Sequence, residues 1–161
     1  MVRLNRSTSI RVLLQNAFGA IQAFLGKRGV QLAHTRLSAN ANRDDVVEPF
    51  ASSAHISIEA IHLILQSIHA AATDRSLRKH TSSSAEAICR VLLELSVDEY
   101  GASGKDVLIR WGLGSSEAVG EIIDRMTEAR ILVRGPQDQS SDYVGLYDLA
   151  NPPSTWKLQW Q

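Results

Sequence analysis

The chain has 161 residues, 44% of them hydrophobic and 21% charged, a composition that can fill the core of one ordinary domain and excludes extensive disorder. Its 17 Lys and Arg balance 17 Asp and Glu, so the overall basic character of many nucleic-acid-binding proteins is absent. One cysteine excludes an intramolecular disulfide and a Cys-rich zinc module, and no apolar run reaches the roughly 20 residues that span a bilayer. We therefore expect a helix-rich cytoplasmic protein with no integral membrane segment.

The neutral total hides an uneven distribution of charge along the chain. Residues 1–80 carry a net charge of +5 and residues 81–161 carry −5, and the first acid is Asp44. Such asymmetry is typical of an arm with its own partner, although the two halves could also complement each other across an internal contact. We predict a basic helical arm with a linker over residues 1–80 and a second domain over residues 81–161.

Apolar residues between Ser7 and Lys27 recur at helical spacing and predict an amphipathic helix over residues 7–27. Its large anchors, Phe18 and Phe24, favour packing in a core or in a dimer seam. An acid-free start rich in Arg and Ser is also typical of an organellar transit peptide, or of a helix lying on an anionic membrane surface. An organelle is therefore the alternative to a cytoplasmic location.

The next stretch, residues 30–52, reads as loop or extended structure, because Pro49 breaks whatever precedes it. A second helix is predicted over residues 57–72, where Ile61, Leu65 and neighbouring apolar residues form an inward stripe. Together with the helix over residues 7–27, it could supply the seam of a homodimer.

His55, His62 and His69 stand seven residues apart, with Glu59 and Gln66 between them at four-residue steps. Seven residues are nearly two helical turns, so these side chains are predicted to form one stripe. Such a stripe could hold a transition metal or respond to pH. It lacks a known metal motif, and the side opposite an apolar stripe is normally solvated. We expect a solvated face, with no metal and no cofactor.

The C-terminal half begins with a polar linker over residues 74–84, followed by three predicted helices. Ser83 and Glu86 form a capping box for a first helix that closes at Asp98–Gly101. Ser103 precedes a short second helix to Trp111, and Ser115 or Ser116 caps a third helix to about Ala129 after a glycine turn. Two strands are then predicted, over residues 131–133 and 143–149, separated by a polar loop.

This order of elements, from Ser83 to Leu149, resembles the winged helix-turn-helix superfamily, most closely over GLGSSEAVGEIIDRMTEARILVRG. The resemblance implies a mainly α fold with a small β-wing, with the third helix in the major groove and the wing on the phosphate backbone. Carried over position by position, it makes base readers of Ser115, Ser116, Glu117, Gly120, Glu121, Asp124 and Arg125, and phosphate contacts of Lys105, Arg110 and Arg134.

Two features depart from this pattern. The third helix carries four acids, which oppose the phosphate attraction that supplies much of DNA affinity. Arg130 stands where the turn into the first wing strand commonly has glycine.

Trp156 and Trp160 alternate with polar residues in the tail, which could pack on its own domain or anchor a partner.

No catalytic constellation emerges, because Cys89 lies on the inward face of a predicted helix and no phosphate-binding glycine motif is present. We expect no enzyme. The leading hypothesis is a small, dimeric, DNA-binding winged-helix regulator of transcription. The alternative is a winged helix used for protein–protein interaction, as a subunit of a larger assembly.

Overall fold

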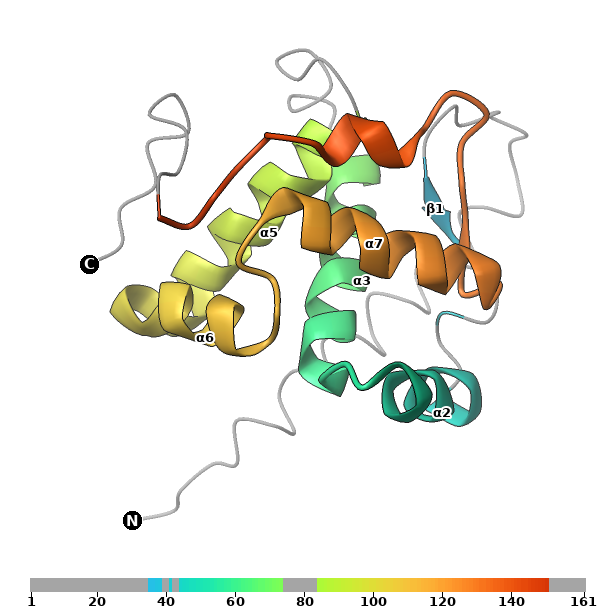
Figure 1. Ribbon diagram of the computed structural model, residues 1–161, viewed down its shortest axis with the longest axis horizontal. Helices are drawn as coiled ribbons and strands as arrows, with labels where there is room; N and C mark the ends of the chain where they lie inside the picture. Colours follow the sequence, from blue (N-terminus) through green and yellow to red (C-terminus); the bar gives the residue numbers. More distant parts are fainter. Residues whose placement is uncertain (1–34, 39–40, 42–43, 74–83, 151–161) are drawn as a thin grey trace. The chain divides into compact units, whose positions relative to one another are not determined.

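The computed structural model describes residues 35–38, 41, 44–73 and 84–150, and this part of the chain is mainly helical (Figure 1). The chain divides into two units, Met1–Gln31 and Leu32–Gln161, and every described residue belongs to the second. The predicted helix over residues 7–27, the predicted boundary near residue 80 and the tail with both tryptophans lie outside the described residues. The elements are β1 (Arg36–Leu37), α2 (Asp44–Ala54), α3 (Ile58–Thr73), α5 (Ser84–Tyr100), the 3-10 helix η2 (Gly101–Ser103), α6 (Gly104–Arg110), α7 (Ser116–Glu128), β2 (Leu132–Val133) and the 3-10 helix η3 (Ser140–Tyr143).

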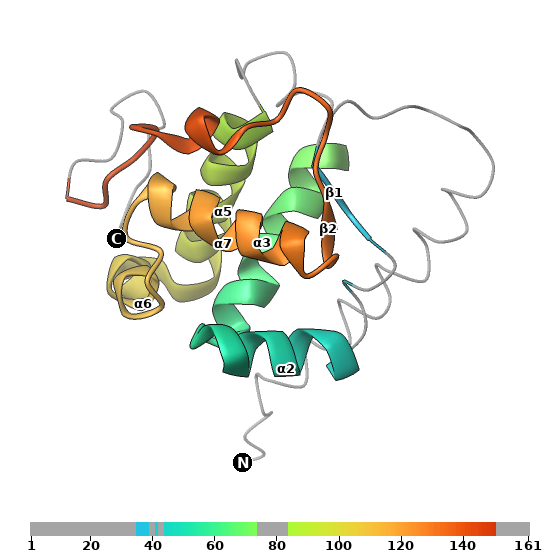
Figure 2. The same ribbon diagram turned by 45° about the vertical axis from the view of Figure 1, so that its right-hand side comes forward.

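Helices from both sides of residues 74–83 build one hydrophobic core. The apolar stripe of α3 packs against α5, and Ile61, Ile64, Leu92 and Leu93 have no exposed surface. Residues of α2, α6, α7 and β2 complete the same core, and α7 lies across it in both views (Figure 2). The stripe predicted over residues 57–72 is therefore buried within the chain itself, which leaves the other faces of α3 for any dimer. None of the described helices combines the length and apolarity needed to cross a membrane.

The prediction of loop or extended structure over residues 30–52 is wrong from Asp44 onwards, where α2 begins. Two aspartates occupy its first turn, where the positive end of the helix dipole favours acids. Pro49 lies inside the helix with its side chain exposed. Proline cannot donate the usual backbone hydrogen bond, and the burial of apolar side chains on the opposite face of the helix offsets this loss. That face buries three apolar residues at i, i+4 and i+7 spacing, namely Val47, Ala51 and Ala54.

The single stripe predicted for the three histidines is wrong at its first member. His55 follows the end of α2 with a left-handed φ of 56°, and α3 begins only at Ile58. Ser57 accepts a hydrogen bond from the backbone N–H of Ala60 at 3.3 Å, which caps the new helix. His55 thus terminates one helix, while His62 and His69 lie on the next.

The three helices predicted after residue 83 are confirmed. Ser115 caps α7 by accepting a hydrogen bond from the N–H of Ala118 at 3.4 Å. Ser103 stands at the N-cap position of α6, although its side chain makes no capping hydrogen bond. Arg130 has a φ of 59°, so the chain makes the left-handed turn after α7 without the glycine that such a turn favours.

The predicted pairing of two wing strands is wrong. β2 pairs antiparallel with β1, with Val133 opposite Arg36, and residues 143–149 form no strand. Tyr143, Tyr147 and Leu149 are all buried, so this segment folds back onto the helices instead of alternating along a hairpin. We call residues 140–149 the strap.

Candidate functional site: the strap along helix α7

The strap returns along α7 from its C-terminal end towards its N-terminal end (Figures 1 and 2). The contacts proceed in order, since Ser140 meets Asp124, Tyr143 packs on Gly120, and Tyr147 meets Ser116. These positions of α7 stand at i, i+4 and i+8 and therefore share one face of the helix. That face includes predicted base readers.

Ser116 is fully enclosed by the strap and the helix. It has no exposed surface, and its hydroxyl oxygen accepts hydrogen bonds from the backbone N–H groups of Leu146 at 3.1 Å and Tyr147 at 3.2 Å. Its own backbone N–H donates to the carbonyl oxygen of Tyr147 at 3.1 Å. Ser116 therefore binds the strap through side chain and backbone together.

Glu117 and Gly120 extend the same contact. The carboxylate of Glu117 accepts a hydrogen bond from the N–H of Gly145 at 2.8 Å, and this bond is the main reason why the pKa of Glu117 is lowered. Gly145 has a φ of 70°, which suits glycine and aims its N–H at α7. A Cβ atom at Gly120 would lie 2.9 Å from the Cβ of Tyr143, so only glycine lets the strap approach this closely.

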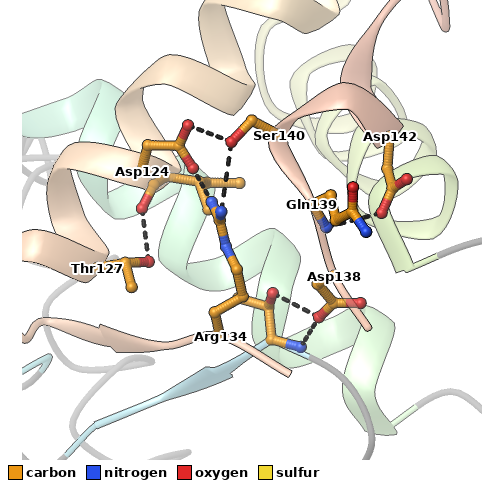
Figure 3. A network of polar contacts seen from close by, with 9 residues as sticks. Asp124, Thr127, Arg134, Asp138, Gln139, Ser140 and Asp142 are labelled. Carbon is orange, nitrogen blue, oxygen red and sulfur yellow. Dashed lines mark hydrogen bonds and ion pairs between the residues drawn. The ribbon is translucent and has the colours of Figure 1, made fainter. Parts of the chain in front are cut away.

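Asp124 and Arg134 form an ion pair beside Ser140, at the start of the strap (Figure 3). Ser140 donates a hydrogen bond to Asp124 and accepts one from Arg134 at 3.3 Å. Just before the strap, Asp138 accepts hydrogen bonds from the backbone N–H and the hydroxyl of Thr35, the hydroxyl at 2.7 Å. The start of the strap is thus tied to α7, and the segment that leads into it is tied to the residue before β1.

Of the remaining predicted readers, Glu121 and Arg125 lie on other faces of α7 and Ser115 directly precedes the helix. Glu121 and Arg125 are exposed, and Arg125 donates a hydrogen bond to the carbonyl oxygen of Ala54 at 3.3 Å, which links α7 to the end of α2. Ser115 is half-buried and occupied as the helix cap.

The three predicted phosphate contacts do not form one cluster. Lys105 and Arg110 belong to α6, which precedes the N-terminal end of α7, whereas Arg134 pairs with Asp124 in its C-terminal half. A helix of 13 residues is about 20 Å long, so these cations are divided between its two ends.

The charge of the described residues is strongly negative. They include sixteen Asp and Glu but seven Lys and Arg, whereas the rest of the chain has ten Lys and Arg and one acid. An acidic surface repels a phosphate backbone and attracts basic groups.

The other reactive side chains of the described residues do not form a second site. Cys89 is fully buried, and burial raises the pKa of its thiol, with a further contribution from the charge of Glu117. Burial lowers the pKa of His69, and the hydroxyl of Ser57 lowers the pKa of Glu59. Within residues 35–38, 44–73 and 84–150, no group of three His, Cys, Asp or Glu could hold a metal ion.

The strap itself is the feature that reasoning from sequence missed. The segment that contains Tyr143 and Tyr147 has the composition of a strand. The polar run before it and the glycine at position 145, which has a left-handed φ in the structure, were the signals of a non-strand segment. Ser116 and Glu117 were interpreted as base readers because the resemblance to the winged helix-turn-helix superfamily implies a third helix in the major groove.

Comparison of the chain with protein-family models, with curated proteins and with solved structures finds no match. Its function must therefore follow from the geometry and charge of its own residues.

Proposed function

We propose that the chain is a protein-interaction module, a subunit that binds a protein partner within a larger assembly. One observation carries this proposal: the strap occupies the face of α7 that includes Ser116, Gly120 and Asp124. A helix that reads bases must bring side chains to base edges within hydrogen-bonding distance. In this chain, Ser116 and Asp124 are already hydrogen-bonded to the strap, and Gly120 is packed against it.

The charge of the described residues supports the same reading. A protein gains DNA affinity by neutralising phosphates, and sixteen acids against seven basic residues work against that gain. The exposed side of α7 offers Glu117, Glu121 and Glu128 beside Arg125. The partner that fits such a surface carries clustered Lys or Arg, with electrostatics that speed and orient association.

The fold is consistent with this use. We propose that α5, α6 and α7 form a helix-turn-helix core of the winged-helix type, in which the strap stands in place of the second wing strand. The order of helices, the turn before Ser115 and the left-handed turn at Arg130 support the relationship. The fold alone does not determine the ligand, because related cores serve different functions.

A dimeric DNA-binding regulator is the second candidate, and the basic start of the sequence favours it. Residues 1–43 have seven basic residues and no acid, so a basic arm could supply the phosphate contacts that α7 lacks. In this alternative, the helices over residues 7–27 and 57–72 form the dimer seam.

Binding of the full chain to duplex DNA across a salt series tests whether α7 takes part in DNA binding. Under the proposal, the charge reversals Glu121→Lys and Arg125→Glu on α7 change DNA affinity by less than about twofold at physiological salt, because charges beyond a Debye length of about 8 Å are screened. A tenfold loss with Arg125→Glu, together with a gain for Glu121→Lys, would show that α7 meets DNA and would overturn the proposal.

The partner itself is tested by a photo-crosslinking residue placed at position 121 of the full chain in its own cells. We expect crosslinks to a protein that the additional change Glu128→Lys abolishes, because this change adds a positive charge to the surface that binds a basic partner. The matched control places the same residue at Glu99, which is exposed near the end of α5. Equal crosslinking at both positions would mean that the contacts are nonspecific.

A further inference from the structure

Ser140 fastens the start of the strap to α7. Its hydroxyl group donates a hydrogen bond to Asp124 and accepts one from Arg134 Nη1 at 3.3 Å (Figure 3). Asp124 and Arg134 also pair with each other, and the two atoms that meet, Asp124 Oδ1 and Arg134 Nη2, are shielded from water. Ser140 therefore closes a triangle of charge-assisted contacts between α7, the residue after β2 and the strap.

Ser140 is also open to solvent. It belongs to a polar segment, residues 136–141, in which every position except Asp138 is exposed. Its neighbour Ser141 is equally exposed, but the hydroxyl of Ser141 donates a long hydrogen bond, at 3.5 Å, to Gln139 of the same segment. The two adjacent serines are thus equally within reach of a modifying enzyme and differ in what their hydroxyls hold.

The charges around Ser140 are mostly negative (Figure 3). Asp124 faces it from α7, and Asp138 and Asp142 lie two residues before and two residues after it, whereas Arg134 is the cation beside it. A phosphate on Ser140 would carry a charge of about −1.5 to −2 at pH 7 and would no longer offer the hydroxyl hydrogen. It would repel Asp124 and compete with it for Arg134, so the carboxylate would lose the contacts that hold the strap.

We propose that Ser140 is a phosphorylation site and that its phosphate releases the start of the strap from α7. A protein kinase transfers the γ-phosphoryl group of ATP to Ser140 Oγ: the new O–P bond forms as the bond to the departing ADP breaks, and the hydroxyl proton passes to the base of the kinase. The acids at positions 138 and 142 suit a kinase with a basic substrate groove.

Release begins three residues further along the strap, where Tyr143 packs on Gly120. It uncovers the face of α7 that the strap occupies. This site is independent of the proposed function, because it depends on how the strap is fastened and not on what α7 binds.

Phosphoserine incorporated in place of Ser140 in the full chain tests the release. The reporter is the backbone N–H of Gly145, which donates to Glu117 of α7 at 2.8 Å. NMR should show that exchange of this amide with water is about tenfold faster, the size expected when one hydrogen bond to a charged group is lost. The N–H of Leu149, which donates to Gly114 at the other end of the strap, is the internal control and should change by less than about twofold.

Phosphoserine in place of Ser141 is the matched control, because it adds the same charge one residue away, where the hydroxyl bonds to Gln139 instead of α7. It should accelerate exchange at Gly145 by less than about threefold. A further chain combines phosphoserine at position 140 with Asp124→Asn, whose neutral amide can donate a hydrogen bond to the phosphate. Relative to Asp124→Asn alone, the acceleration should then also fall below about threefold.

The modification itself is tested on the full chain isolated from its own cells with phosphatases inhibited, in which mass spectrometry should locate phosphate on Ser140. An unmodified Ser140 in that chain would overturn the assignment. Unchanged exchange at Gly145 with phosphoserine at position 140, or equal acceleration from positions 140 and 141, would overturn the release. An effect that Asp124→Asn leaves undiminished would show that the phosphate does not act through this carboxylate.

Discussion

Replacing Ser116 by alanine removes the acceptor that two amides of the strap share. The hydroxyl oxygen accepts from the N–H groups of Leu146 and Tyr147, and the serine has no exposed surface through which water could replace it. Each buried N–H left without a partner costs about 1–3 kcal/mol. We therefore expect Ser116→Ala to lower the free energy of unfolding by roughly 2–4 kcal/mol, allowing for partial relaxation of the strap.

The neighbouring serine is the matched control. Ser115 accepts one hydrogen bond, from Ala118 at 3.4 Å, as an ordinary helix cap. Removing such a cap costs about 1 kcal/mol, and this long bond places Ser115→Ala at or below that value. The two substitutions delete the same atom from adjacent residues, so their difference isolates the attachment of the strap.

Urea unfolding of the full chain, followed by circular dichroism, measures both variants. A thermal melt of the same variants gives a second readout. For a chain of this size, 1 kcal/mol corresponds to a change of about 2–4 °C in Tm, so Ser116→Ala should lower Tm by roughly 6–12 °C at the middle of the expected range. The reasoning is refuted if Ser116→Ala costs no more than Ser115→Ala with an unchanged m-value, because the strap amides would then not depend on this hydroxyl.

Three further predictions follow from the packing. Gly120→Ala should lower the free energy of unfolding by about 1–3 kcal/mol because its Cβ would clash with Tyr143, although alanine is the better helix former; an increase in stability would contradict the close approach. Burial lowers the pKa of His69 below its usual 6.5, so the stability it contributes is complete above pH 6.5 and declines as the pH falls below that value. His69→Gln should reduce this decline in a pH series of urea melts, and an unchanged slope would assign the effect elsewhere. Cys89 should react with a thiol reagent only upon unfolding, because burial raises the pKa of the thiol and excludes the reagent; rapid labelling of the native chain would argue against the core position.

Local signals in the sequence were sufficient to predict a helix where that helix has a cap and a continuous apolar stripe. Ser115, one of the two serines predicted as the cap, caps α7, and Val119, Ile123 and Met126 are fully buried along its inner side. The same reasoning failed for α2, because Pro49 suggested a break while only three small or branched apolar residues marked the buried face. A proline on the exposed side of a helix is tolerated when tertiary contacts stabilise the other side.

The candidate site was located only in part. The sequence drew attention to Ser116, Glu117, Gly120 and Asp124 as a group on α7, and the structure brings these four together on the strap. Their role as base readers was inferred from the resemblance to a DNA-binding fold. Whether a polar residue at a helix start faces a ligand or its own chain depends on partners about 30 residues away, such as Tyr147, which no local pattern reveals.

By itself, the sequence determined the helical class, the three helices over residues 84–128 and the uneven charge, because these depend on neighbours within a few residues. Only the tertiary structure decided that β2 pairs with β1 and that the strap lies along α7. Both choices depend on contacts between residues far apart in the chain. Burying Tyr143, Tyr147 and Leu149 against the helices removes more apolar surface from water than an exposed two-stranded wing would.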